Sequence, residues 1–427
     1  MTIFAKLSNL PARRLLASSR FKYLWAGQVV SQIGDGLNKV ALLWFVYNLT
    51  GSAIDMTLVG VLQSLPPLLL SPFLGVFIDR LPKKPLLISI DLARAVLIAL
   101  IPVLYLLGAL NLPVVYALTF ANAVVAAAFG PAMAASIPQL VRAEEFTAAN
   151  GLIHSATTAG VLVGPALGGL LAAFIGAQNV LYVDAATFVF SAACLSFLRL
   201  AGDSTDLTRS LDDVQVFGEI KQGLHFIFAR QPMIAWLMGA SAVFAAGIGA
   251  FPIMLPIFAK AQLHVGSVWL GWIWSALGAG MVSMTIGLAV VKNTSARTNL
   301  LIMGGGSAVA ALATLSLSLV SGPHPALVIT AVIGASTALF TPLLWTLLQN
   351  YTIASVRGRI FTLIGTVDMT ASTLAMGMAG LLAEYAGPST SLRMLALLFL
   401  GAAALIAFIV WHSRPRYTTL ASSAANE

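Results

Sequence analysis

The chain has 427 residues, of which 59% are hydrophobic and only 9% are charged. Soluble domains carry about 25% charged residues, so this composition excludes a string of soluble domains and predicts an all-α polytopic membrane protein. The formal net charge of +8 comes mainly from cations that separate hydrophobic spans, so it indicates membrane topology and no nucleic-acid partner. Cys194 is the only cysteine, which excludes an intramolecular disulfide and a cysteine-based metal cluster.

Twelve hydrophobic stretches are long enough to cross a bilayer, which takes ~20 apolar residues. No signal-peptide core or cleavage site stands out before the first of them, so residues 1–20 are expected to remain as a cytoplasmic lead-in. The predicted spans are 21–48, 53–78, 86–108, 113–140, 147–174, 179–199, 232–258, 268–291, 299–320, 325–350, 359–383 and 391–412.

The Lys and Arg residues fall almost entirely on one side of these spans. An even number of spans places both termini on the same side, and with the N-terminus inside only Lys260 and Arg393 lie in outer segments. The positive-inside rule therefore predicts a multi-pass protein of the inner or plasma membrane with both termini cytoplasmic. The inner segments, besides the N-terminal cluster, hold Arg80, Lys83, Lys84, Arg142, Arg199, Arg209, Lys221, Arg230, Lys292, Arg297, Arg357, Arg359, Arg414 and Arg416.

The two groups of six spans echo each other. Three short matches recur at an offset of 211 residues, each in the corresponding span, which indicates a parallel duplication. They are Trp25 with Trp236, Phe129-Gly-Pro131 with Phe340-Thr-Pro342, and Gly169-Leu-Leu-Ala172 with Gly380-Leu-Leu-Ala383. We therefore predict an N-terminal segment (1–20), a six-helix half (21–199), a cytoplasmic linker (200–231), a second six-helix half (232–412) and a cytoplasmic tail (413–427). Within the linker, residues 216–229 suit either a short interfacial helix or a plain tether.

Polar side chains follow one side of the first span. Their spacing of four, three and four stacks them on a single helix face. They are Gln28, Gln32, Asp35 and Lys39, and the face is widened by Ser31 and Asn38. A charge at the bilayer centre costs at least ~2.5 kcal/mol, so Asp35 is expected to face a protein interior or a wet cavity, where it would serve as a proton or cation site. The alternative is that Asp35 and Lys39, one turn apart, pair and neutralise each other. Gln28, Gln32, Asn38 and Lys39 are the candidates for the cavity lining.

Asp368 is the second candidate for proton coupling. It lies among hydroxyl side chains in the eleventh span, with no cation nearby in sequence. A lone carboxyl in such a span can exchange a proton, and the alternative is a hydrogen-bonded contact between helices. In span ten, Trp345, with Thr341 and Gln349 near it, suits an aromatic cavity wall or an interfacial anchor.

A short charged join connects the second and third spans. Its residues are Gly75-Val-Phe-Ile-Asp79-Arg80-Leu-Pro-Lys83-Lys84. Four charges on so short a join place it at a membrane surface, with its cations facing water or lipid phosphates and Asp79 at the start of the next helix. A positively charged stop between two spans would account for it. The spacing Gly-x-x-x-Asp-Arg-x-x-Lys-Lys also resembles the loop signature of the major facilitator superfamily, which implies two six-helix halves around a midplane cavity.

That resemblance gives the neighbouring charges a role in gating. It implies that Asp79, Arg80 and Arg142 form a charge cluster that holds the two halves shut on the cytoplasmic side. Asp91 and Arg94, at i and i+3 in the third span, can pair with each other and are counted with this cluster.

The fifth span contains Gly160-Val-Leu-Val-Gly164-Pro165-Ala-Leu-Gly168-Gly169, with small residues at spacings of four and a proline that can bend the helix. Close helix packing is one consequence. The run also resembles the antiporter signature of facilitator-family drug exporters, which implies a bend at the interface between the two halves.

The first half resembles the macrolide-efflux and enterobactin-exporter branch of the superfamily. The residues that carry this likeness are Trp25-Ala-Gly-Gln28, Gly75-Val-Phe-Ile-Asp79-Arg80, Asp91-Leu-Ala-Arg94, Pro138-Gln-Leu-Val141, Ala149-Asn150-Gly151 and Glu219-Ile-Lys-Gln-Gly223.

Residues and resemblance together predict a secondary active exporter. It would move an amphipathic or lipophilic, drug-like molecule by alternating access in exchange for protons. The alternative is a siderophore or lysophospholipid transporter of the same fold, without proton coupling. No Ser/His/Asp arrangement, phosphate-binding Gly loop or metal-ligand spacing occurs in the sequence, so we expect no enzyme activity, cofactor or metal site. We expect a monomer whose partners are its solute, protons and the lipid bilayer.

Overall fold

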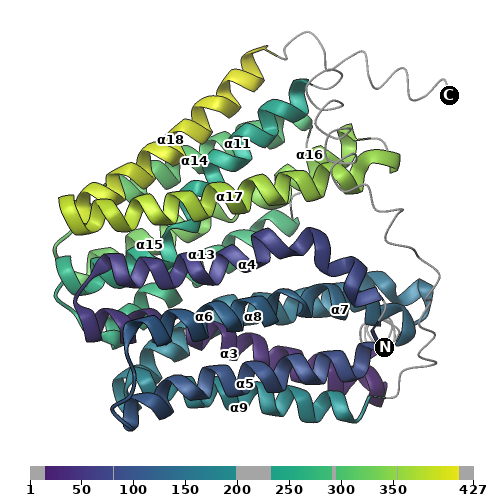
Figure 1. Ribbon diagram of the computed structural model, residues 1–427. Coiled ribbons are helices and arrows are strands. Elements are labelled where there is room, and N and C mark those ends of the chain that lie inside the picture. The colour runs from purple at the N-terminus through teal and green to yellow at the C-terminus, as the bar shows by residue number, and fades with distance from the viewer. Residues whose placement is uncertain (1–14, 80, 199–231, 291–294, 353, 413–427) are drawn as a thin grey trace, which may run out of the picture. The chain divides into compact units, whose positions relative to one another are not determined.

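A computed structural model describes residues 15–79, 81–198, 232–290, 295–352 and 354–412 of the chain (Figure 1). The described elements are all helices. They form two compact units, the first within residues 1–214 together with Val265–Ser275 and the second within residues 215–264 and 276–427. The predicted linker helix at 216–229 and the predicted tail at 413–427 lie outside the described residues.

The first unit contains the helices of the first six predicted spans. They are α3 (Ser19–Thr50), α4 (Ala53–Asp79), α5 (Lys83–Leu106), α6 (Leu112–Ala127), α7 (Phe129–Ser136), the 3₁₀ turns η1 (Ile137–Gln139) and η2 (Ala143–Glu145), α8 (Phe146–Ile175) and α9 (Ala177–Ser196). The remaining helices are α11 (Pro232–Gly249), α12 (Phe251–Ile257), the π-helical turn η4 (Phe258–Gln262), α13 (Ser267–Val290), α14 (Ala296–Leu317), α15 (Pro323–Thr337), α16 (Phe340–Tyr351), α17 (Ala354–Ala386) and α18 (Pro388–His412). The start of α13 groups with the first unit and its remainder with the second.

Eleven helical stretches in the described part of the chain are long and apolar enough to cross a membrane. The first predicted span, α3, is not among them although its 32 residues exceed the length required. Its polar face lowers its hydropathy, because amide and charged side chains recur along one side of the helix. A helix of this length and polarity is stable in a bilayer when neighbouring helices cover that face.

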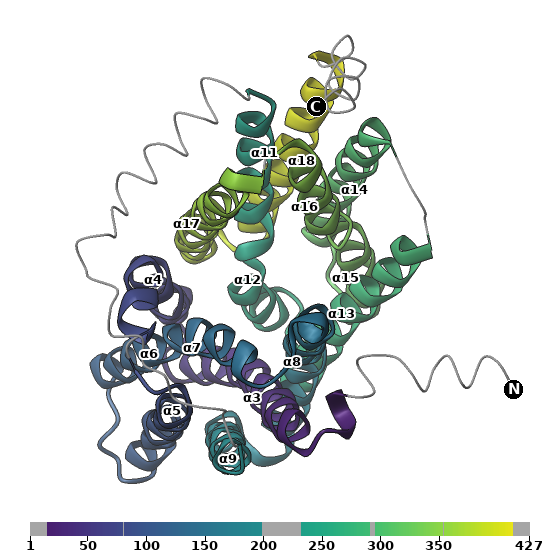
Figure 2. The ribbon, with the colours of Figure 1, turned by 90° about the vertical axis from the view of Figure 1, so that its right-hand side faces the viewer.

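The same helix pairings occur in both units. In the first, α3 packs against α8 and α9, and α5 packs against α9 and α6; Figure 2 shows α8 and α9 on two sides of α3. In the second, α11 packs against α17 and α18, and α14 packs against α18 and α15. In the first unit these pairings join spans one, three, four, five and six. In the second unit they join the corresponding spans seven, nine, ten, eleven and twelve. The repeated packing agrees with the duplication that the 211-residue offset indicates.

Two predicted spans are each divided into two helices at equivalent positions. New helices begin at Phe129 and Phe340, the first residues of the matched Phe-Gly-Pro and Phe-Thr-Pro segments. Proline fits the first turn of a helix, where its missing N–H leaves no hydrogen bond unmade. The prolines of these segments, Pro131 and Pro342, therefore fall where a helix can restart. The predicted spans 113–140 and 325–350 are thus each built from more than one helix, and span seven is likewise divided into α11, α12 and η4.

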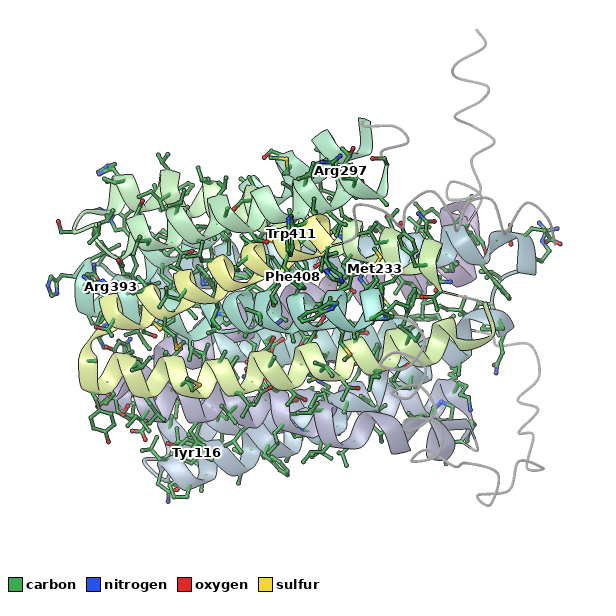
Figure 3. All side chains as sticks on the ribbon, turned by 90° about the horizontal axis from the view of Figure 1, so that it is seen from above. Tyr116, Met233, Arg297, Arg393, Phe408 and Trp411 are labelled. Carbon is green, nitrogen blue, oxygen red and sulfur yellow. The ribbon has the colours of Figure 1, made fainter. Side chains whose placement is uncertain are left out.

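The second unit has distinct ends. Figure 3 shows Arg393, near the start of α18, at the end opposite Trp411 on the same helix, while Arg297 at the start of α14 lies toward the Trp411 end. Phe408 packs there against Trp236 of α11, with ring centroids 5.0 Å apart. The sequence assigns Arg297 and Arg393 to opposite membrane faces, and their separation suits that assignment.

Candidate functional site

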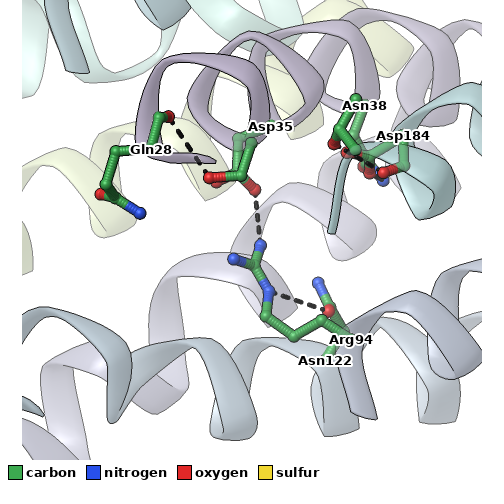
Figure 4. A network of polar contacts seen from close by, with 8 residues as sticks. Gln28, Asp35, Asn38, Arg94, Asn122 and Asp184 are labelled. Carbon is green, nitrogen blue, oxygen red and sulfur yellow. Dashed lines mark hydrogen bonds and ion pairs between the residues drawn. The ribbon is translucent and has the colours of Figure 1, made fainter. Parts of the chain in front are cut away.

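The centre of the first unit contains an ion pair between two helices. The Arg94 guanidinium on α5 donates a 2.5 Å hydrogen bond to Asp35 on α3 (Figure 4). Its Nε donates a longer hydrogen bond of 3.4 Å to the Asn122 side chain of α6, and its guanidinium carbon lies 4.0 Å from the centre of the Phe188 ring of α9. The Arg94 side chain is 8% exposed and that of Asp35 is 28% exposed. The pair therefore has one enclosed member and one partly open member.

This geometry corrects two expectations. Asp35 pairs with Arg94 and not with Lys39, and Arg94 pairs with Asp35 and not with Asp91. Lys39 is exposed. The Arg94 charge is enclosed by surrounding helices, and an enclosed charge needs a carboxylate partner within reach. Arg94 meets that need across helices, which local sequence spacing does not reveal.

A second polar contact joins α3 to α9. Asn38 donates a 2.7 Å hydrogen bond to the carboxylate of Asp184, and Asp184 is fully buried. Gly34 makes room for it, since a Cβ at Gly34 would lie 2.6 Å from Asp184 Oδ1. Two features of the sequence could have indicated this contact between helices: the glycine at position 34, and the carboxylate of Asp184 within a largely apolar span.

Asp91 lies on α5 one turn before Arg94 and is 1% exposed. Neither of its carboxylate oxygens has a hydrogen-bond partner among the described residues. The Ser191 hydroxyl of α9 faces it, beyond hydrogen-bonding geometry. The first unit thus contains three carboxyl groups and one guanidinium in its interior.

The remaining polar residues of α3 divide into an inner and an outer set. Gln28 and Asn38 are 4% and 7% exposed, so in this conformation they contact protein and not a solute. Gln32 is half-buried and Lys39 is exposed. Of the four predicted cavity residues on this helix, Gln32 and Lys39 are therefore the ones open to a solute.

The glycines of the fifth span bring α8 against α3. A Cβ at Gly164 would lie 2.5 Å from the Cα of Gly36, and a Cβ at Gly168 would lie 2.9 Å from the carbonyl of Leu37. Gly160 packs in the same way against the backbone at Gln32. These contacts lie within the first unit, and α8 stays one helix through Pro165. On its other side Gly169 meets Gly271, in the segment that groups with this unit.

The two lysines of the charged join bind carbonyl groups at helix ends. Lys83, which is 7% exposed, donates hydrogen bonds of 2.6 Å and 2.8 Å to the carbonyls of Ile78 and Leu81. Lys84 donates hydrogen bonds of 2.6 Å and 2.7 Å to the carbonyls of Ser196 and Leu198, at the end of α9. The last carbonyls of a helix lack partners within it and carry a partial negative charge, so cations stabilise them.

The predicted gating cluster is only partly visible. Asp79 is the last residue of α4 and not the start of the next helix, and Arg80 lies outside the described residues. Arg142 is 77% exposed and pairs with Glu145, at 3.5 Å. Gly75 lies within α4. The closure of two halves by these charges stays a prediction.

In the second unit Asp368 of α17 accepts a 2.7 Å hydrogen bond from Ser241 of α11. Its other carboxylate oxygen is buried and has no hydrogen-bond partner among the described residues. One turn further along α17, the Ser372 hydroxyl donates a 2.8 Å hydrogen bond to the carbonyl of Ala245. The predicted helix contact is therefore present, and it leaves half of the carboxyl group available for a proton.

The predicted aromatic wall has an ordered geometry. The Trp345 ring of α16 packs edge-on against Phe361 of α17, with ring centroids 4.6 Å apart. Thr341 and Gln349, on the same helix, are exposed. Nearby in sequence, Phe340 stacks on Phe244 with ring centroids 3.9 Å apart. No three His, Cys, Asp or Glu side chains in the described part of the chain lie close enough to bind a metal ion.

This fold, with its charged residues enclosed between membrane-crossing helices, defines a polytopic membrane protein. Residues 24–376 match the family described as the Major Facilitator Superfamily. The chain belongs to that superfamily, and it is a multi-pass membrane transporter and not an enzyme.

Curated relatives and a solved structure resemble most of the chain. The multidrug efflux pump Tap of Mycolicibacterium fortuitum is 29% identical over 364 residues, which cover 83% of this chain and 87% of that protein. Macrolide efflux protein A of Streptococcus pyogenes is 23% identical over 372 residues, which cover 86% and 90%. A crystal structure of a mutant of the nucleoside transporter NupG superposes with a TM-score of 0.70 at 12% identity and covers 92% of this chain and 99% of that one. At that identity the structural likeness shows the fold alone.

Proposed function

We propose that this transporter is a secondary active exporter, which moves an amphipathic or lipophilic, drug-like molecule out of the cell in exchange for protons by alternating access. The names of two relatives, a multidrug efflux pump and a macrolide efflux protein, support export and this class of solute. We further propose that both termini are cytoplasmic and that the protein acts as a monomer in the plasma membrane.

One observation carries the proton coupling. Each unit has a partly open carboxyl group inside a membrane-spanning helix, Asp35 on α3 and Asp368 on α17. Charged groups are costly inside a membrane and persist where they serve transport or form pairs. Asp35 is paired with a cation that also donates a hydrogen bond to Asn122, and Asp368 has one oxygen without a hydrogen-bond partner among the described residues. Both groups are therefore placed to gain or lose a proton as their partners move.

Exposed polar side chains on two membrane helices support a hydrated solute path. On α8 the exposed face carries Asn150, His154, Thr157 and Thr158, which are spaced along one side of the helix. On α17 the exposed face includes Thr366, close to Asp368. An imidazole or amide is poorly matched to hydrocarbon, so such faces favour a water-filled cavity.

Transport in proteoliposomes with an imposed pH gradient tests the proposal. Wild type, Asp35→Asn and Asp368→Asn are compared with a cationic dye, a macrolide, a catecholate siderophore and a lysophospholipid as solutes. We expect the dye or the macrolide to move uphill only with the gradient, and at least one substitution to abolish that dependence. The proposal would be overturned if only the lysophospholipid or the siderophore moved, without a pH gradient and equally fast in both variants. That result would contradict both the proposed class of solute and the proton coupling.

A further inference from the structure

The interior of the first unit holds more carboxyl groups than it has cations to neutralise them. Arg94 faces Asp35 from α3, Asp91 from its own helix and Asp184 from α9. If all three carboxyl groups were ionised, this enclosed region would carry an excess of two negative charges. Ionised groups away from water are strongly unfavourable without a partner, so at least one of the three must be neutral.

The hydrogen bonds single out Asp91 as the neutral group. Asp35 accepts the short hydrogen bond from Arg94, and Asp184 accepts a 2.7 Å hydrogen bond from Asn38. Both contacts stabilise an ionised carboxylate. One oxygen of Asp184 also lacks a partner, but among the described residues Asp91 is the one of the three that accepts no hydrogen bond on either oxygen, and at 1% exposed it cannot be solvated instead.

We propose that Asp91 holds a proton while Arg94 binds Asp35, and that the transport cycle exchanges these two partners. This inference rests on the proposed proton-coupled transport. Arg94 lies one turn from Asp91 on α5, so rotation of its long side chain can bring the guanidinium to Asp91. The Asp91 O–H bond then breaks as its proton leaves to water, and the carboxylate pairs with Arg94. Asp35, released from Arg94 and 28% exposed, takes up one proton from water.

The exchange leaves the charge of the interior unchanged. Before and after it, one of the two carboxyl groups is paired with Arg94 and the other is protonated. Asp91 is then the enclosed proton store, and Asp35 is the group that meets water. An ion pair and a proton that change places in this way supply two states of similar energy, which a transport cycle needs.

The surroundings of Asp91 contain few other ionisable groups. From α3 it faces Asp35, from α5 Arg94, and from α9 the neutral Ser191. Two other helices pack against α5. Helix α7 has no ionisable residue. Helix α6 has Tyr116, whose hydroxyl donates a 2.9 Å hydrogen bond to Asp55. Arg94 and Asp35 therefore govern the proton on Asp91.

Infrared spectroscopy of the purified full-length protein tests the proton directly. A protonated carboxyl group has a C=O stretching band separate from the bands of a carboxylate. At about pH 7 ordinary exposed Asp and Glu side chains are ionised, so shielded carboxyl groups dominate this band. We expect one component to vanish in Asp91→Asn and to persist in Asp184→Asn. An unchanged band in Asp91→Asn, or loss of that component in Asp184→Asn instead, would overturn the proposal.

A neutral Asp91 also predicts that its amide replacement folds. Asp91→Asn should keep the melting temperature of wild type within a few degrees, because no charge is removed. A large loss of stability in Asp91→Asn would show an ionised Asp91 and would overturn the assignment as well.

Transport separates this inference from the function on which it rests. With a cationic dye and a macrolide as solutes, Asp91→Asn should lose uphill transport driven by a pH gradient and keep downhill transport. Coupled transport in wild type and equally in Asp91→Asn would overturn the role of Asp91 alone. Uncoupled transport in wild type would overturn the proposed antiport, and the exchange with it.

Discussion

Arg94 Nη2 and Asp35 Oδ1 lie 2.5 Å apart, and this contact joins α5 to α3 across 59 positions of the sequence. The Phe188 ring of α9 covers the guanidinium of the same arginine. Asn122 of α6 accepts a hydrogen bond from it as well, so four helices of the first unit meet at one side chain. Because α3 also carries the other polar residues of this interior, the ion pair fixes the position of the face on which the proposed coupling depends.

Removing Arg94 should destabilise the protein by about 3 kcal/mol, because the carboxylate of Asp35 loses its counter-charge. We expect this loss in Arg94→Gln, measured as the unfolding of detergent-solubilised protein. Asp35→Asn should cost less, because in the proposed exchange Arg94 can turn to Asp91, one turn away on α5. In the double variant Asp35→Asn/Arg94→Gln the two losses should not add, because neither charge remains. Additive losses would show that the pair contributes nothing.

Gly164→Ala should disrupt the packing of α8 on α3. The new Cβ would lie 2.5 Å from the Cα of Gly36, and backbone cannot move aside as a flexible side chain can. We expect a loss of about 1–3 kcal/mol or more, typical of overpacking. Gly151→Ala on the same helix is the matched control, since nothing lies within 4 Å of its added Cβ. Equal melting temperatures of the two variants would contradict this account of the packing.

Lys84→Met should loosen the end of α9. It removes two hydrogen bonds from an ammonium group to the carbonyls of Ser196 and Leu198. Hydrogen bonds to charged groups contribute about 1.5–3 kcal/mol each, and partial exposure places this site at the lower end. Hydrogen exchange should show faster opening of the last turn of α9 in Lys84→Met. The control Lys22→Met changes an exposed lysine and should leave that turn as protected as in wild type.

Phe244→Ala should destabilise the second unit strongly. Phe244 is 5% exposed, stacks on Phe340 at 3.9 Å and contacts Phe399 at 5.5 Å. Truncation of a buried phenylalanine costs about 3–5 kcal/mol. Phe174→Ala, at a side chain that is 78% exposed, should change the melting temperature little. A similar small change in both variants would show that the aromatic stack does not hold this unit together.

The sequence alone predicts the fold class well because each span must bury its own backbone hydrogen bonds and match the bilayer thickness. Length and hydropathy therefore define the helices. The breaks before Phe129 and Phe340 were missed, although both segments had been recognised as a repeat. Membrane helices often tolerate proline, so the presence of Pro131 or Pro342 does not by itself predict a new helix.

The candidate site was predictable only within single helices. Spacings of three and four place Asp35 on the polar face of α3, and the structure keeps that face together. Its partner came from another helix, and so did the partners of Asp184 and Lys84. Contacts between helices depend on rotation and tilt, which a single sequence does not encode in its local spacing. The roles of Asp35 and Asp368 in proton coupling stay predictions.

Proton movement driven by a solute gradient tests the proposed antiport most directly. Proteoliposomes with a pH indicator inside, and with no imposed pH gradient, receive the dye or the macrolide outside. Antiport predicts that entry of the solute drives protons outward, so that the interior becomes more alkaline in wild type and not in the variant that loses coupling. Solute entry without any change of internal pH in wild type would contradict the account.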